Sequence, residues 1–268
     1  FTNNPIVKAI GTQKIVVVLV IVLLALFFGI KSPAFRQYST VVSIFGYSYY
    51  ISLMAIGVTF CLITGGVDLS IGTGMICYSL FGGYLVTKMG LPVGVGILAT
   101  IVLGMLIGLL NAVLVAVMDL PPFIATLGTM MICRGLGSIL TGGMSVAWPP
   151  TAAPQGWFRN IFKINVNGTI IPVGFILILL LVFVMSAFLN KSRPGRYIIA
   201  IGSNKEATRL AGVNVKFYHM LAYIISGLFA GLSGVAYAAT YATIYPGSGA
   251  GFELDAIGGA IVGGVSAT

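Results

Sequence analysis

Three carboxylates lie in otherwise apolar stretches, where they could hold a polar solute. Asp68 belongs to the segment GGVDLS at residues 65–70, which interrupts two apolar runs. Glu253 and Asp255 follow a glycine-rich loop and open the last apolar run. Such carboxylates either cap the amide groups of a helix start or accept hydrogen bonds from a hydroxylated solute. Glu253 and Asp255 could also form an ion pair with another helix, and the sequence leaves these roles open.

The segment around Asp68 predicts an interrupted helix. Two glycines and then an acid break the apolar pattern, and either Asp68 or Ser70 is expected to cap the helix that follows. Irregular backbone at membrane depth is tolerated only where it is buried in protein or lines a watery cavity. Gly66, Asp68 and Ser70 are therefore candidates for a solute path as well as for a structural break.

The sequence lacks the residue patterns of catalysis and of metal binding. It contains no GxxxxGK[ST] phosphate loop, no HExxH pair and no GxSxG nucleophile. Cys61, Cys77 and Cys133 are isolated in apolar runs, without the spacing of a zinc site or a disulfide framework. His219 is the only histidine, so no proton relay of Asp, Glu and His is evident. We expect a chain that is not an enzyme and that holds no metal or cofactor of its own.

The elements that position these residues are expected to be membrane helices. The chain is 58% hydrophobic and only 7% charged, with a mean hydropathy of +1.08, and a spanning helix needs about 20 apolar residues. We predict an all-α, polytopic membrane protein that forms a single transmembrane domain over residues 1–268 and lacks its original ends. The predicted helices lie near 14–30, 46–64, 70–87, 92–118, 122–141, 171–190, 217–243 and from about 253 onward. The glycine pairs Gly104/Gly108, Gly227/Gly231 and Gly259/Gly263 predict close helix packing.

A basic segment at residues 191–216 separates the sixth and seventh predicted helices. It carries six of the fourteen basic residues, which predicts a cytoplasmic location by the positive-inside rule. A cytoplasmic N-terminus, with Lys8 and Lys14, gives the same result by helix count, and the loop at 142–170 then lies outside. Nucleic-acid binding is not expected, because no basic, aromatic-bearing soluble domain exists to carry it.

Within the basic segment, the sequence predicts a short helix that is closed at both ends. Ser203 is the expected N-cap and Glu206 its capping-box partner, while Gly212 suits the left-handed position after the helix. An apolar stripe lies between them, at Ala207, Leu210 and Ala211. Such a helix either docks into a partner protein, with polar contacts at the rim from Lys205, Glu206 and Arg209, or lies on anionic membrane lipid.

Four segments together resemble one known family. They are GVDLSIG at 66–72, PFIATLGT at 122–129, GRY at 195–197 through GVNV at 212–215, and ELDAI at 253–257. These segments, which occur in the right order along essentially the whole chain, are similar to those of the ribose-type permeases of bacterial ABC importers. That group handles ribose, galactose, xylose, allose and the sugar-like autoinducer.

The resemblance implies about ten membrane helices, so that two would follow Thr268. It also implies the bacterial inner membrane and a dimer with a second permease copy or a paralogue, with the solute path at the interface. A cytoplasmic ATP-binding subunit, often two fused ATPase domains, would bind ATP and Mg²⁺, and an extracytoplasmic sugar-binding protein would deliver the sugar. Glu206-Ala207-Thr208 departs from the commoner Glu-Ala-Ala pattern of other ABC importers.

These expectations rest on two sets of residues. The residues expected to couple the permease to the ATPase are Ser203, Lys205, Glu206, Ala207, Arg209, Leu210, Ala211 and Gly212. The candidates for the solute path or for a broken helix are Gly66, Asp68, Ser70, Phe123, Thr126, Glu253 and Asp255. The alternatives are an ABC permease for nucleosides or branched-chain amino acids, an ion-coupled secondary transporter with broken helices, and a channel.

Overall fold

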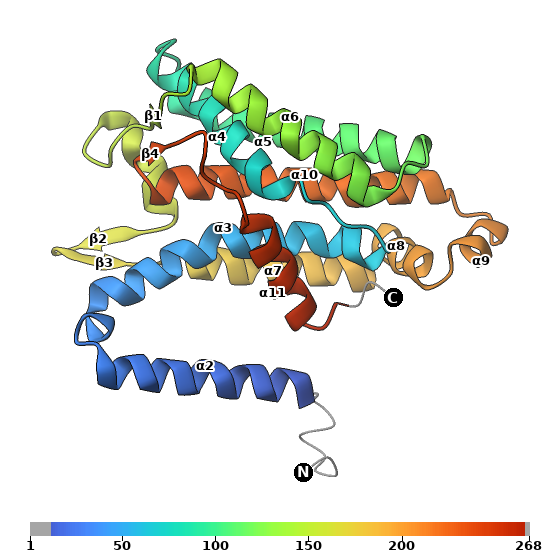
Figure 1. Ribbon diagram of the computed structural model, residues 1–268, viewed down its shortest axis with the longest axis horizontal. Helices are drawn as coiled ribbons and strands as arrows, with labels where there is room; N and C mark the ends of the chain where they lie inside the picture. Colours follow the sequence, from blue (N-terminus) through green and yellow to red (C-terminus); the bar gives the residue numbers. More distant parts are fainter. Residues whose placement is uncertain (1–11, 266–268) are drawn as a thin grey trace.

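The computed structural model describes residues 12–265, which form an all-α bundle (Figure 1). Its main helices are α2 (Thr12–Lys31), α3 (Tyr38–Ile63), α4 (Ile71–Thr87), α5 (Val93–Ala112), α6 (Pro122–Thr141), α7 (Gly174–Lys191), α10 (Val215–Thr240) and α11 (Phe252–Val262). A π-helical turn, η2 (Val113–Val117), prolongs α5. The shorter helices are η1 (Ala34–Arg36), η3 (Pro154–Ile161), α8 (Arg193–Ser203) and α9 (Lys205–Leu210). Two small antiparallel pairs join β1 (Val146–Ala147) to β4 (Thr243–Ile244), and β2 (Ile164–Val166) to β3 (Thr169–Ile171).

A helix forms at each of the eight predicted positions, and the last of them, α11, has 11 residues in the described part of the chain. Five of them (α3, α5 with η2, α6, α7 and α10) are long and apolar enough to span a membrane, and α2 and α4 have shorter apolar stretches. The chain is therefore a multi-pass α-helical membrane protein. The sequence placed the start of α3 near residue 46, but the helix begins at Tyr38, because its first turns carry hydroxyl side chains that hide the helix in a hydropathy profile. The N-terminal Lys8 and any segment after Thr268 lie outside the described residues.

Helix α10 is the centre of the bundle, and glycine contacts bring α5 against it. A Cβ built on Gly104 would lie 2.5 Å from the carbonyl oxygen of Gly227. One built on Gly231 would lie 2.8 Å from the Cα of Ile101. Both distances are far shorter than an ordinary carbon contact of about 3.5–4 Å, so these positions require glycine. The predicted role in helix packing is confirmed for Gly104/Gly108 and Gly227/Gly231, whereas a Cβ on Gly259 meets nothing within 4 Å among the described residues.

The two ends of the bundle carry different structures (Figure 1). Helices α8 and α9 lie at one end, and η3 with the β2–β3 hairpin lies at the other. At the hairpin end, the buried Trp148 donates its indole N–H to the carbonyl of Ser79, 3.0 Å away. The guanidinium of Arg159 donates to the carbonyls of Trp148, Pro149 and Ala239. These bonds fix the 142–173 segment to α4 and α10.

Candidate functional site

The break between α3 and α4 lies inside the bundle, with Asp68 at its centre. Helix α4 has only 17 residues, about 25 Å, whereas α3 has 26, so α4 starts part of the way into the bundle. The side chain of Asp68 is 1% exposed. Its Oδ1 accepts from the N–H of Ser70 at 3.0 Å and from the Ser70 hydroxyl at 2.6 Å. Its Oδ2 accepts from the hydroxyl of Ser226 on α10 at 2.8 Å.

Further polar side chains extend this network to α5 and α6. Asn111 donates through Nδ2 to Ser70 Oγ at 2.9 Å and to Asp68 Oδ1 at 3.4 Å. Thr129 donates to Asn111 Oδ1 at 2.7 Å. We call these five buried residues, Asp68, Ser70, Asn111, Thr129 and Ser226, the Asp68 network. It joins the break to three other helices and satisfies both oxygens of the carboxylate.

Other predicted path residues divide between this buried break and the surface. Thr126 is fully buried, and its hydroxyl donates to the carbonyl of Val67 at 3.2 Å. A Cβ on Gly66 would collide with the hydroxyl of Tyr223. Phe123, in contrast, is 59% exposed in the first turn of α6. The structure thus brings Gly66, Asp68, Ser70 and Thr126 together but leaves Phe123 apart.

A second break precedes α11 and meets the first one. Gly251 begins this helix with a φ of 96°, a conformation that favours glycine. Glu253 is buried, and its Oε1 accepts from the N–H of Gly251 at 3.1 Å. Its Oε2 has no hydrogen-bond partner in the described part of the chain and lies against Gly72, in the first turn of α4. The starts of the two interrupted helices are therefore in contact.

Asp255 faces a different neighbour from Glu253. Its carboxylate is exposed and accepts from the hydroxyl of Tyr47 on α3, 2.8 Å away. The ring of Tyr47 packs edge-on against Phe252 and Tyr50, with centroids 6.0 and 5.2 Å apart. Glu253 therefore contacts α4 while Asp255 contacts α3. Helix capping alone does not explain both carboxylates.

The basic segment at 191–216 forms two helices rather than one. Helix α8 was missed from the sequence, because its amphipathic pattern contains no long apolar run. Its N-cap is Ser192, whose hydroxyl oxygen accepts from the N–H of Gly195 at 3.1 Å. Ser203, the predicted N-cap of the second helix, is instead the last residue of α8.

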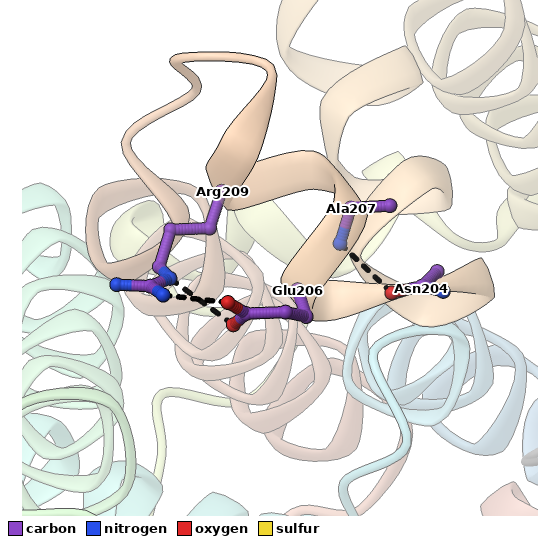
Figure 2. A network of polar contacts seen from close by, with 4 residues as sticks. All are labelled: Asn204, Glu206, Ala207 and Arg209. Atoms are coloured by element: carbon purple, nitrogen blue, oxygen red, sulfur yellow. Dashed lines mark hydrogen bonds and ion pairs between the residues drawn. The ribbon is translucent and has the colours of Figure 1, made fainter.

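The capping box predicted for the second helix is wrong by one residue. Asn204 is the N-cap of α9, and its Oδ1 accepts from the N–H of Ala207 at 2.9 Å (Figure 2). Glu206 is therefore one position too early to reach back to the cap. Its carboxylate instead pairs with the guanidinium of Arg209, with one contact at 3.1 Å (Figure 2). This hydrogen bond lowers the pKa of Glu206, so the exposed pair keeps both charges at neutral pH.

The apolar stripe of α9 is uncovered in this structure. Leu210 is 78% exposed, and Ala207 and Ala211 are exposed beside it. Only Thr208 is buried, where its hydroxyl donates to the carbonyl of Asn204 at 2.8 Å. Gly212 follows with a φ of 81°, the left-handed conformation predicted for it.

Close contacts hold α8 and α9 against the membrane helices. A Cβ on Gly202 would collide with the carbonyl oxygen of Ile63, the last residue of α3. The rings of Tyr197 on α8 and Tyr218 on α10 have centroids 4.8 Å apart. Beside α9 lies a cavity of about 290 Å³. Its polar lining residues are Asp119, Lys205, Glu206, Arg209, Lys216 and His219.

Sequence reasoning missed three members of the Asp68 network: Asn111, Thr129 and Ser226. The available signal was a polar side chain within an apolar helix, and Asn111 is the clearest case because its amide stands between leucine and alanine. It also missed Tyr47 as the partner of Asp255. The sequence gives no direct indication of that pair, because 208 positions separate the two residues.

Several known membrane permeases are similar in sequence to this chain. Residues 40–268 match the family described as branched-chain amino acid transport system / permease component. The chain is 34% identical to a ribose import permease of Escherichia coli, over 88% of this chain and 72% of the relative. It is 32% identical to an autoinducer 2 import system permease of Salmonella typhi, over 96% of this chain and 72% of the relative.

A third relative is a fructose import permease of Bifidobacterium longum, which is 32% identical over 82% of this chain and 65% of the relative. No solved structure matches the chain. The family match covers every membrane helix from α3 to α11 and both helix breaks. The chain belongs to the monosaccharide-type permeases of ABC importers, as a transport subunit that spans the membrane.

Proposed function

We propose that this permease carries a monosaccharide into a bacterial cell, driven by ATP that a separate subunit hydrolyses. The observation that carries the proposal is the exposed apolar stripe of α9, because a capped helix with an uncovered Leu210 is shaped to enter a groove on another protein. In this arrangement the 191–216 segment faces the cytoplasm of the inner membrane, as its basic residues favour. ATP and Mg²⁺ belong to the partner, either a single ATPase domain or two fused ones.

The contacts around α8 supply a route for movement from the partner to the membrane helices. A push on α9 reaches α3 through the contact of Gly202 with Ile63, and it reaches α10 through Tyr197 and Tyr218. Both receiving helices border the first break. Helix α3 leads directly into it, and α10 holds it through Ser226 and Asp68.

Movement of α4 at the first break is transmitted to α11 at the second break, because Glu253 on α11 lies against Gly72 on α4. Docking of the ATPase at α9 is thereby linked to the two interrupted helices. We infer that their displacement opens the solute path alternately to each side, at the interface with a second permease copy or a paralogue. An extracytoplasmic sugar-binding protein delivers the solute at the end of the bundle that carries η3 and the β2–β3 hairpin.

The substrate is inferred from the relatives, which import ribose, autoinducer 2 and fructose. Nucleosides and branched-chain amino acids, the alternative cargoes, are not favoured by these relatives. An ion-coupled secondary transporter is also disfavoured, because an exposed docking helix has no role in such a protein. The four buried donors around Asp68 further leave its carboxylate without a free oxygen for a coupling ion.

The experiment that tests the docking is co-purification of the full-length permease from its own cells in a mild detergent. We expect an ATPase subunit in the wild-type sample and its loss from a Leu210→Asp variant, because a carboxylate would have to be buried in an apolar groove. Met144→Asp is the matched control, since Met144 is 71% exposed at the opposite end of the bundle. Recovery of the ATPase with both variants would move the docking surface away from α9. Its absence from every sample would remove the ATP-driven proposal.

A further inference from the structure

A second, larger cavity lies at the end of the bundle opposite α8 and α9. It has a volume of about 560 Å³. Its walls are the first turns of α3, the residues just before the β2–β3 hairpin, the turn and strand β3 of that hairpin, and the C-terminal end of α10. None of the coupling or path residues named above lines it. The cavity is therefore separate from the helix breaks and from the docking helix.

The wall formed by α3 carries two serine hydroxyls on one helix face. Ser39, Ser43 and Gly46 recur at spacings of four and three residues, which places them above one another on that face. Tyr49 continues the wall and is 2% exposed. Its hydroxyl has no hydrogen-bond partner within residues 12–265. Because a buried hydroxyl without a partner is unfavourable, this group is suited to donate to a ligand in the cavity.

The opposite wall supplies a cation without a counter-charge. Lys163 lines the cavity and is partly buried, and desolvation together with the charge of Arg159 lowers the pKa of its ammonium group. Among the described residues, the only ion pair is Glu206 with Arg209, at the other end of the bundle. Arg159 is itself buried and donates only to carbonyl groups. Two cations in a low-dielectric environment thus produce a positive potential that no carboxylate cancels.

The remaining lining combines apolar side chains with the hydroxyl-bearing residues Tyr38, Thr169, Thr240 and Tyr241. Val42, Phe162 and Ile170 contribute apolar surface to the cavity. Trp157, which is 53% exposed in η3, lies at the same end of the bundle. Exposed aromatic side chains of this kind are enriched at membrane interfaces. An occupant with anionic oxygens and a hydrocarbon part would satisfy both walls.

We propose that this cavity binds the phosphate group of an anionic phospholipid. Lys163 contacts the phosphate as a cation, and Tyr49 donates its hydroxyl proton to a phosphate oxygen. The glycerol and first acyl carbons lie against Val42 and Phe162. The bound lipid would connect the start of α3 to the segment before the hairpin and to the end of α10.

Native mass spectrometry of the full-length protein tests the proposal. The protein is transferred from nanodiscs that contain phosphatidylglycerol or phosphatidylcholine, and the retained lipid is counted. We expect phosphatidylglycerol to be retained several-fold more often than phosphatidylcholine, and we expect this preference to disappear in Lys163→Gln. Lys163→Arg should keep the preference because it keeps the charge. Tyr49→Phe should weaken retention without unfolding the protein, as checked by its melting temperature.

Lys88→Gln is the matched control. Lys88 is exposed at the C-cap of α4 and does not line the cavity, so its loss should leave lipid retention unchanged. Equal retention of phosphatidylglycerol by Lys163→Gln and by the wild type would overturn the proposal. So would protection from unfolding by inorganic phosphate that requires Lys163 in lipid-depleted protein, because the site would then serve the free anion.

Discussion

Asp68 is a carboxylate whose surroundings argue for a structural role, even though an acid inside a membrane domain suggests a direct contact with the solute. Its two oxygens accept from the amide and hydroxyl of Ser70, from Asn111 and from Ser226. Both oxygens of the buried carboxylate therefore already accept hydrogen bonds from the protein. In this conformation the Asp68 side chain attaches the break to α5 through Asn111 and to α10 through Ser226.

This arrangement predicts a difference between two substitutions. Asp68→Asn keeps an oxygen for the Ser70 amide, and its new amide group can donate to Ser226, whose hydroxyl can turn to accept. We therefore expect it to keep most of the uptake of labelled sugar. Asp68→Ala leaves several buried donors without an acceptor, at about 1–3 kcal/mol each, and should lower both melting temperature and uptake. Loss of uptake in a stable Asp68→Asn variant would show that the charge itself acts on the solute.

Among the elements, the long apolar helices were predictable, whereas their mutual contacts were not. A membrane core requires about 20 apolar residues per crossing, so hydropathy, with the prolines at 121–122, located α6 and the continuous helix of α5 and η2 to within a residue or two. Helix α8 is amphipathic and lacks such a run, and the cap of α9 moved from Ser203 to Asn204 because α8 extends to Ser203. The break at 65–70 was expected. Its contact with the start of α11 depends on folding of the whole chain.

That contact predicts a strong effect at Gly72. A Cβ there would lie 2.8 Å from the backbone nitrogen of Glu253 and 2.9 Å from the carbonyl of Gly249. Backbone atoms cannot turn aside, so Gly72→Ala must displace α11, at about 1–3 kcal/mol for an overpacked contact. We expect a lower melting temperature and a loss of sugar uptake. Gly94→Ala is the control, because a Cβ there meets nothing within 4 Å among the described residues. Equal behaviour of the two variants would mean that α4 and α11 are not in contact in the working protein.

For the molecule as a whole, the contact between Gly202 and Ile63 is where the basic segment meets the bundle. Gly202→Ala would push α8 away from the end of α3 while leaving the exposed stripe of α9 intact. We expect the variant to recover the ATPase as the wild type does but to transport several-fold less sugar per ATP hydrolysed. Gly135→Ala, where a Cβ meets no atom within 4 Å in the described structure, should change neither quantity. Normal transport by Gly202→Ala would place the route of coupling elsewhere, for example through Tyr197 and Tyr218.

The central position of α10 also has a consequence for how the protein is made. Helices α3 and α5 leave the ribosome well before Val215, so the glycine positions with which they pack against α10 lack that partner while more than a hundred further residues are synthesised. Gly104 and Gly108 face only lipid or neighbouring insertion machinery during that interval. Assembly of the core therefore waits for α10. A nascent chain released before that point would expose the surfaces that membrane quality-control proteases can recognise.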